Sequence, residues 1–251
     1  MIRGAKIAAV FFVAMLGLLG VCGSAGAVEP PEPVSHWTFD EGTGSVAHDW
    51  VGNNDGIIYG AQWTTGQIDG ALSFDGDGDY VELPDDMLDS HSTGTVCAWV
   101  KGNGGTVLGF GDSSWWTQKA VMSTSATSAS AFVRRDGSGD QLTVNLDNNI
   151  NSERWNHICW IQDGNNISIY VNGTEQSVTR TITGTATYGD WFDDIASTCE
   201  NVDIGRLEDD TPGDYFTGTI DDVRIYDRAL SAEEIWQLYQ DGLGGHGKGK
   251  K

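Results

Sequence analysis

Two polar segments of the sequence carry aromatic and acidic residues side by side, a combination that proteins use to bind sugars. One segment contains Asp112, Trp115 and Trp116, and the other contains Trp191. The faces of pyranose rings stack on exposed aromatic side chains, while neighbouring carboxylates hydrogen-bond the hydroxyl groups. We therefore expect these four residues to bind carbohydrate. In the alternative interpretation, both segments are lids that pack over the core, and their tryptophans are buried.

Carboxylates gather in four short clusters that can supply oxygen ligands to a metal ion. The clusters are Asp40-Glu41, Asp75/Asp77/Asp79, Glu208-Asp209-Asp210 with Asp214, and Asp221-Asp222. Calcium takes roughly six to eight oxygen ligands from carboxylates and carbonyl groups. These clusters therefore indicate a calcium site, and the capping of ordinary turns is the alternative use of the same residues.

Two cysteines, Cys97 and Cys159, lie in short segments that alternate as strands, TVCAWV and HICWI. In an exported protein, cysteines at matched strand positions favour a disulfide, and two buried thiols are the alternative. Closing so long a loop would stabilise the fold by about 4 kcal/mol on the chain-entropy model. Cys199 then stays unpaired in a loop, or competes for either partner.

Short alternating segments bounded by turn residues predict an all-β protein. They include residues 95–100, 107–110, 141–146, 155–162 and 167–171, and the last is followed by Asn172-Gly173, a strong hairpin signal. The chain also contains 34 glycines and ten tryptophans, which indicates many tight turns between aromatic-rich strands. We therefore expect two antiparallel sheets packed face to face, with little helix.

A last strand and one helix are expected to close the fold. In residues 216–226 the apolar side chains alternate until Asp221-Asp222 interrupts the pattern. Ser231 and Glu234 have the spacing of a capping box, and an apolar stripe of helical period follows them. Gly242 is placed to end this helix.

Five stretches of the sequence carry a family resemblance. They are WTFDEGTG, NNDGIIYGA, GALSFDGDGDYVELP, WNHICWIQDGNNISIYVNG and FTGTIDDVRIYDRALSAEEIWQLY. In this order they resemble the laminin G-like jelly-roll domains of the concanavalin A-like lectin and glucanase superfamily, and more distantly the pentraxins. The resemblance spans about Val34 to Gly242. It implies one domain, a two-sheet antiparallel β-sandwich of the jelly-roll type with one short C-terminal helix.

The resemblance also implies a position for a structural calcium ion. Laminin G-like jelly rolls carry one where the loop that leaves the first strand meets the last strand. In this sequence that position corresponds to the carboxylates of Asp40 and Asp222, with a carbonyl oxygen from Gly42.

The related pentraxins imply two further features. They bind ligands through calcium on a loop that corresponds to residues 205–209. Asp209 matches that loop and is expected to contact the ligand, but Leu207 stands where a second carboxylate would be needed. The pentraxins also place a disulfide between strands that resemble those of Cys97 and Cys159.

Motifs for catalysis are missing from the sequence. Retaining endoglucanases of the superfamily use paired carboxylates in the pattern Glu-x-Asp-x-x-Glu. The nearest match begins at Glu208, but it contains Pro212 and ends in Gly213. The patterns Gly-x-Ser-x-Gly and His-Glu-x-x-His are also absent. We therefore expect a protein that is not an enzyme, in which His157 has a structural role.

Residues 1–27 have the features of a signal peptide. Arg3 and Lys6 precede an apolar run at residues 7–19, and small residues at 25–27 form a cleavage site. We therefore expect a secreted protein, extracellular or periplasmic, with no membrane span. A cell-surface lipoprotein anchored at Cys22 is the alternative.

Three further regions follow the signal peptide. Residues 28–33 form a proline-rich leader, residues 34–242 form the jelly-roll domain, and residues 243–251 form a basic Gly/Lys tail that we expect to be disordered. The formal net charge is −22, so nucleic acids and anionic membranes would be repelled.

These observations predict an exported recognition module that binds carbohydrate or a cell-surface glycoconjugate and is stabilised by calcium. One alternative is a structural or adhesive surface protein that binds a protein partner. A second is a polysaccharide-cleaving enzyme whose carboxylates are not paired in the sequence.

Overall fold

The computed structural model describes residues 31–88, 91–111, 119–135, 139–195, 201–208 and 214–244. The strands and the α-helix of this part lie between Ser35 and Gly244. The predicted signal peptide and most of the predicted basic tail lie outside the described residues. Within the described ranges, no helix is both long enough and apolar enough to cross a membrane.

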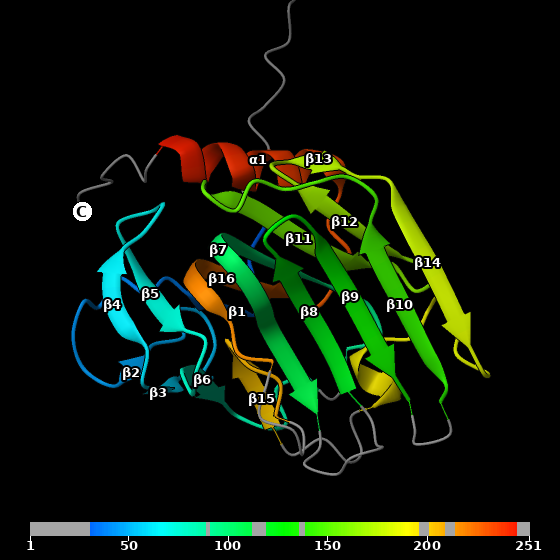
Figure 1. The fold of residues 1–251 in the computed structure, drawn as a ribbon, viewed down its shortest axis with the longest axis horizontal. Coiled ribbons are helices and arrows are strands. Elements are labelled where there is room, and N and C mark those ends of the chain that lie inside the picture. Colours follow the sequence, from blue (N-terminus) through cyan, green and yellow to red (C-terminus); the bar gives the residue numbers. More distant parts are fainter. Residues whose placement is uncertain are drawn as a thin grey trace, which may run out of the picture.

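Two antiparallel layers of strands face each other across the core (Figure 1). In the first layer the strands follow the order β14-β10-β9-β8-β7-β15-β6-β3-β2. Their bounds are β2 Val46–Ala47, β3 Gly56–Tyr59, β6 Tyr80–Leu83, β7 Gly94–Gly111, β8 Lys119–Ser125, β9 Ala129–Arg134, β10 Gln141–Leu146, β14 Val178–Thr183 and β15 Asn201–Ile204.

The second layer is arranged around β16, which pairs with β1, β5 and β7. Strand β4 extends this layer beyond β5, and β11, β12 and β13 extend it beyond β7. The bounds are β1 Ser35–Trp37, β4 Gln62–Thr65, β5 Gly70–Asp75, β11 Asn156–Gln162, β12 Ile167–Val171, β13 Thr174–Glu175 and β16 Thr217–Tyr226. The prediction of an antiparallel jelly roll with one short C-terminal helix is confirmed.

Strand β7 belongs to both layers because it bends in its middle. Its first part pairs with β11 and β16, and its last part pairs with β8 and β15. At the bend, Gly102 and Gly105 have φ angles of 137° and 129°, which favour glycine. A Cβ on Gly102 would lie 2.5 Å from the Cα of Gly218. The strands expected at residues 95–100 and 107–110 are therefore halves of one strand.

The helix α1 (Ala232–Gly244) begins where the capping box predicts. The amide of Ser231 donates to Glu234 Oε2 at 2.8 Å, and the amide of Glu234 donates to Ser231 Oγ at 3.3 Å. The predicted end at Gly242 is wrong, because the helix continues to Gly244. Gly242 instead packs closely, since a Cβ there would lie 2.6 Å from the indole of Trp99.

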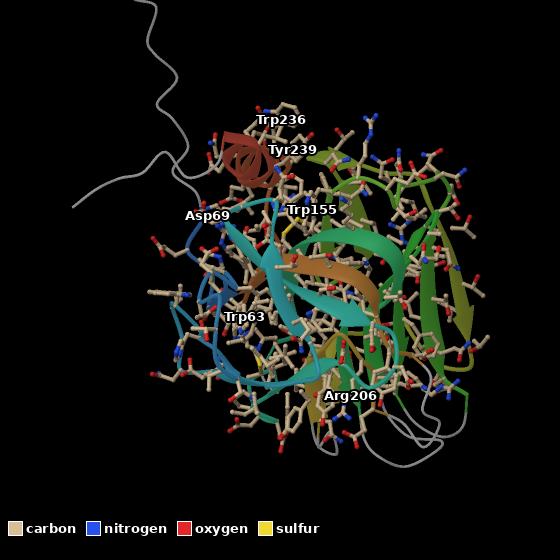
Figure 2. The ribbon with its side chains drawn as sticks, turned by 60° about the vertical axis from the view of Figure 1, so that its left-hand side comes forward. Trp63, Asp69, Trp155, Arg206, Trp236 and Tyr239 are labelled. Atoms are coloured by element: carbon tan, nitrogen blue, oxygen red, sulfur yellow. A yellow bond between two sulfur atoms is a disulfide. The ribbon has the colours of Figure 1, made fainter. Side chains whose placement is uncertain are left out.

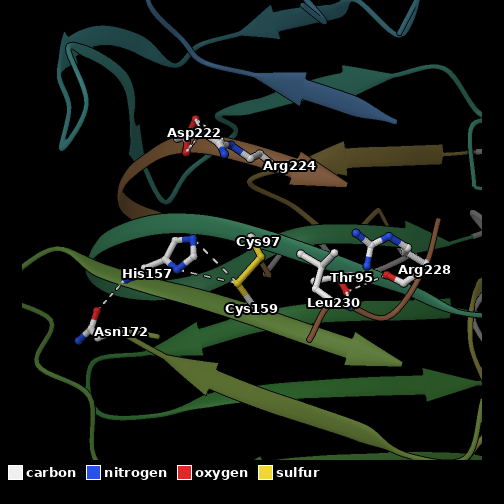
Figure 3. Close-up of a disulfide and its surroundings, with 9 residues drawn as sticks. All are labelled: Thr95, Cys97, His157, Cys159, Asn172, Asp222, Arg224, Arg228 and Leu230. Carbon is white, nitrogen blue, oxygen red and sulfur yellow. Dashed lines mark hydrogen bonds and ion pairs between the residues drawn. A yellow bond between two sulfur atoms is a disulfide. The ribbon is translucent and has the colours of Figure 1, made fainter. Parts of the chain in front are cut away.

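A disulfide joins β7 to β11 (Figure 3). It belongs to a buried cluster that also contains Ile235 and Leu238 of α1. Cys97 and Cys159 lie directly opposite each other with their Cα atoms 4.1 Å apart, and both are fully buried. The structure thus contains the disulfide that the sequence predicts. His157 is buried with its ring centre 5.1 Å from that of Trp99, and burial lowers its pKa to about 4. It is a neutral structural residue at neutral pH.

Candidate functional site

A groove lies on the outer face of β8 and β9. Successive side chains of a strand point to opposite faces, and Ala120, Met122 and Val133 of these strands point into the core. The alternate residues of the same strands line the groove, which has a volume of about 260 Å³. Its lining consists of Lys119, Val121, Ser123, Phe132, Arg134, Leu207 and Asp214.

The strand register arranges the outer side chains in rows. Lys119 lies opposite Arg134, and Ser123 lies opposite Ser130 with the two hydroxyl oxygens 2.8 Å apart. Polar side chains continue these rows across the neighbouring strands β10 and β14: Gln141, Thr143, Asn145, Thr179, Thr181 and Thr183. Hydroxyl, amide and cationic groups therefore lie around Phe132, and Val121 lies directly opposite it on β8.

Arg134 is held beside the groove by two neutral groups. Its Nη2 donates to Gln141 Oε1 at 3.0 Å, and its guanidinium carbon lies 5.4 Å from the centre of the Phe132 ring. The second distance is that of a cation–π contact. Its Nε has no hydrogen-bond partner among the described residues. The two contacts orient the guanidinium and leave its positive charge in place.

The segment that follows β15 forms one wall of the groove. Leu207 reaches the groove because Gly109 lacks a side chain: a Cβ there would lie 2.9 Å from the Cα of Leu207. Arg206 fixes this segment through two contacts. Its Nε donates to Asp203 Oδ2 at 2.9 Å, and its guanidinium carbon lies 3.5 Å from the centre of the Tyr80 ring. Burial raises the pKa of Asp203 to about 7, although Arg206 acts in the opposite direction.

The expectation that Trp191 stacks on a sugar is wrong. Its side chain is fully buried, and its ring centre lies 4.4 Å from that of Phe192. The turn before it is fixed by Asp190, whose side chain accepts from Thr187 Oγ1 at 2.6 Å and whose carbonyl accepts from Gln162 at 3.1 Å. The segment around Trp191 therefore packs as a lid over the core, as the alternative interpretation of the sequence predicts.

The other predicted ligand-binding residues lie outside the described residues. They are Asp112, Trp115, Trp116 and Asp209. In the sequence, two groove residues stand directly beside the omitted segments, since Lys119 follows residues 112–118 and Asp214 follows residues 209–213.

Among the residues predicted to bind calcium, Asp222 already has basic partners. It lies at an irregularity of β16 with a φ of 50°. One oxygen is 2.6 Å from His36 Nε2. The other is 3.0 Å from Arg224 Nη2 (Figure 3). Burial acts to raise the pKa of Asp222, but Arg224 and His36 together hold it well below its usual range. Gly42 lies in the exposed turn after β1, with a φ of 66°.

The neighbouring carboxylate, Asp221, is buried and only partly hydrogen-bonded. Its Oδ2 accepts from the amide of Ile68 at 2.9 Å, whereas its Oδ1 has no partner within the described part of the chain. Burial raises the pKa of Asp221 to about 8, and the charges of Asp222 and Asp40 act in the same direction. Asp40 accepts from the amide of Gly70 at 2.7 Å, and burial raises its pKa as well. A bound cation would relieve this unbalanced burial of carboxylates.

Solved structures share this fold at low sequence identity. Domain 4 of AbnA, a GH43 extracellular arabinanase from Geobacillus stearothermophilus solved with arabinotriose, is 21% identical with a TM-score of 0.63, and the match covers 84% of this chain and 100% of that one. The CBM40 of Ruminococcus gnavus IT-sialidase bound to α2,3 sialyllactose is 14% identical with a TM-score of 0.53, covering 73% and 96%. The Trypanosoma rangeli sialidase is 18% identical with a TM-score of 0.55, covering 83% and 33%.

Sequence comparison assigns the family. No curated protein matches this sequence. A family model described as the concanavalin A-like lectin/glucanases superfamily matches residues 75–236, which is more than half of the chain. The two-layer jelly roll agrees with this match, and the chain belongs to the concanavalin A-like lectin/glucanases superfamily.

Proposed function

We propose that the protein is an exported, non-catalytic recognition module that binds carbohydrate in the groove over β8 and β9. The observation that carries the proposal is the composition of the groove. The apolar ring of Phe132 lies among the side chains of Lys119, Ser123, Arg134 and Asp214. An apolar ring offers a face to the C–H groups of a sugar, and the polar groups around it match the sugar's hydroxyl groups.

The comparisons support binding of a sugar as the class of function. Two of the solved structures with this fold are named as complexes with arabinotriose and with sialyllactose. Their low identity to this chain leaves the identity of the sugar open to experiment. The competing function is binding of a protein partner on the same face, and such binding would not depend on glycans.

The acidic groups of the groove favour a protein that binds carbohydrate over one that cleaves it. Glycosidases flank the scissile bond with two carboxylates, about 5 Å apart when they retain configuration and about 6.5–9.5 Å apart when they invert it. Among the described residues that line the groove, Asp214 is the one carboxylate. We therefore propose a protein that binds polysaccharide without releasing products from it.

Replacing Phe132 by alanine should weaken glycan binding about five- to 150-fold, corresponding to about 1–3 kcal/mol. The melting temperature should change little, because the ring lies on the outer face of β9. Binding is measured on a printed array of plant, microbial and animal glycans, followed by calorimetry with the best oligosaccharide.

The matched control for this experiment is Trp236→Ala. Trp236 is 49% exposed and lies on α1, at the opposite end of the molecule from Arg206 of the groove wall (Figure 2). Its loss should leave glycan affinity unchanged. If the wild-type protein binds no glycan, or if both variants lose affinity equally, the groove is not the carbohydrate site.

We also propose that a calcium ion stabilises the fold at the carboxylates of Asp221 and Asp40. The buried and unpartnered Oδ1 of Asp221 supports this, and a calcium ion would supply the balancing charge there. Asp222 and Gly42 stay predictions as further ligands. Because calcium binds the ionised carboxylate, its affinity should rise as the pH increases toward the pKa of Asp221, about 8.

Calcium should therefore raise the melting temperature of the purified protein, and a chelator should lower it. A calcium concentration a hundredfold above the dissociation constant adds about 2.7 kcal/mol to the free energy of unfolding. Asp221→Asn should abolish this response without destabilising the chelated protein, because it removes a buried carboxylate but keeps a side-chain oxygen. Asp227→Asn, at an exposed position, is the control and should respond like wild type. An unchanged response in Asp221→Asn would exclude this carboxylate from a calcium site.

A further inference from the structure

Basic side chains line the groove of a strongly acidic protein. The sequence contains 14 lysines and arginines against 36 aspartates and glutamates. Two of the basic residues, Lys119 and Arg134, nevertheless line the groove, and Asp214 is the acidic residue among the described residues of its lining. The two basic residues also lie directly opposite each other on β8 and β9.

The partners of Arg134 differ from those of the arginine in the adjacent wall. Arg206 is paired there with the carboxyl groups of Asp203, at 2.9 Å, and Glu208. Arg134 instead contacts the neutral amide of Gln141 and the ring of Phe132, and its Nε has no hydrogen-bond partner in the described ranges. Its guanidinium is therefore oriented by neighbours that do not cancel its charge.

We infer that the groove selects carbohydrates that carry a carboxylate, such as uronic or sialic acid residues. The inference rests on the proposed carbohydrate function and names the class of sugar. A guanidinium forms charge-assisted hydrogen bonds to a carboxylate with a planar, paired geometry that a hydroxyl group does not offer. Phe132 and Gln141 fix the plane of Arg134 for this contact, while Ser123 and Ser130 lie one row further for the hydroxyl groups of the same or the next sugar.

The test compares pairs of glycans that differ in the charged sugar or in its carboxylate. The probes are oligogalacturonate with its methyl ester and 3′-sialyllactose with lactose, each titrated calorimetrically into the full-length mature protein. For at least one pair the acidic member should bind about tenfold more tightly or better, which corresponds to about 1.4 kcal/mol. This ratio should shrink when sodium chloride is raised from about 0.05 M to about 0.5 M, because salt screens exposed charges.

Arg134→Gln should bring the affinity ratio of the responding pair close to one. Arg134→Lys should restore only part of the ratio, because an ammonium keeps the charge but not the paired geometry. Arg154→Gln is the control, since Arg154 is exposed in the turn before β11, and should keep the wild-type ratio.

The outcomes separate this inference from the proposed function. Equal affinity for both members of every pair that binds would overturn the preference for carboxylates and leave carbohydrate binding standing. A wild-type ratio in Arg134→Gln would also overturn it, because the selecting charge would then lie elsewhere. Binding of no glycan, on the array or by calorimetry, would overturn both proposals.

Discussion

Replacing Trp191 by alanine should lower the free energy of unfolding by about 3–5 kcal/mol, the cost of truncating a buried tryptophan. The indole is fully buried and packs against Phe192, and the structure offers no solvent-exposed face of it to a ligand. For a domain of this size the melting temperature should fall by about 2–4 °C for each kcal/mol. Denaturation in urea, followed by tryptophan fluorescence and circular dichroism, measures the loss.

Trp50→Ala is the matched control, because Trp50 is 63% exposed. It removes the same side chain from the surface and should change the stability by about 0.5 kcal/mol or less. If Trp191→Ala were as stable as the control while its glycan affinity fell, Trp191 would be a surface residue and the described position of its segment would be wrong.

Removing the disulfide should have an effect of similar size. The double variant Cys97→Ala with Cys159→Ala should lose about 2–5 kcal/mol, as expected when a long closed loop is opened. The two strands remain paired on both sides of the cysteines, so the fold should persist with a lower melting temperature. Equilibrium unfolding of the double variant against wild type measures this loss.

A chemical experiment checks the same pairing without mutation. Alkylation of the folded, oxidised protein should modify neither Cys97 nor Cys159, because both sulfurs are joined and fully buried. Unfolding without reductant should still protect them, and unfolding with reductant should expose both. Labelling of either cysteine in the unfolded, unreduced protein would contradict the disulfide.

The features that the sequence predicts correctly depend on local patterns. Strands β10 and β12 have the bounds that apolar alternation predicts, and the capping box of Ser231 and Glu234 forms as expected. The disulfide follows from two cysteines at the centres of strongly patterned strands. Such signals lie within a few residues of each other, so no knowledge of distant contacts is needed to interpret them.

The sequence does not predict the groove, because the strands β8 and β9 that form it lack a clear apolar alternation. Their inner positions carry small residues, including Ala120, Ala129 and Ala131, and several of their outer positions carry serine or charged side chains. The apolar alternation that marks a strand is therefore weak from residue 119 to residue 134. The apolar residues Val121 and Phe132 at outer positions interrupt the alternation further.

Two site residues depend on contacts that are distant in the sequence. Trp191 has polar and acidic neighbours in the sequence, which suggest an exposed side chain. In the structure its ring is buried, and the turn before it is held by a hydrogen bond from Gln162 to Asp190. The sequence does not predict that Asp221 and Asp222 have different surroundings. The irregularity of β16 places the carboxylate of Asp222 against Arg224 and that of Asp221 against the amide of Ile68. Neither distinction is encoded in local periodicity.

The most direct test of the central proposal is to map the bound sugar on the protein. The protein labelled with nitrogen-15 is titrated with the oligosaccharide that binds best on the array, and amide chemical shifts are followed by nuclear magnetic resonance. The proposal predicts that the largest shifts fall on β8, β9 and Leu207, around Phe132, and that they disappear in Phe132→Ala. Shifts confined to α1 and the hairpin of β12 and β13, with the groove unchanged, would contradict it.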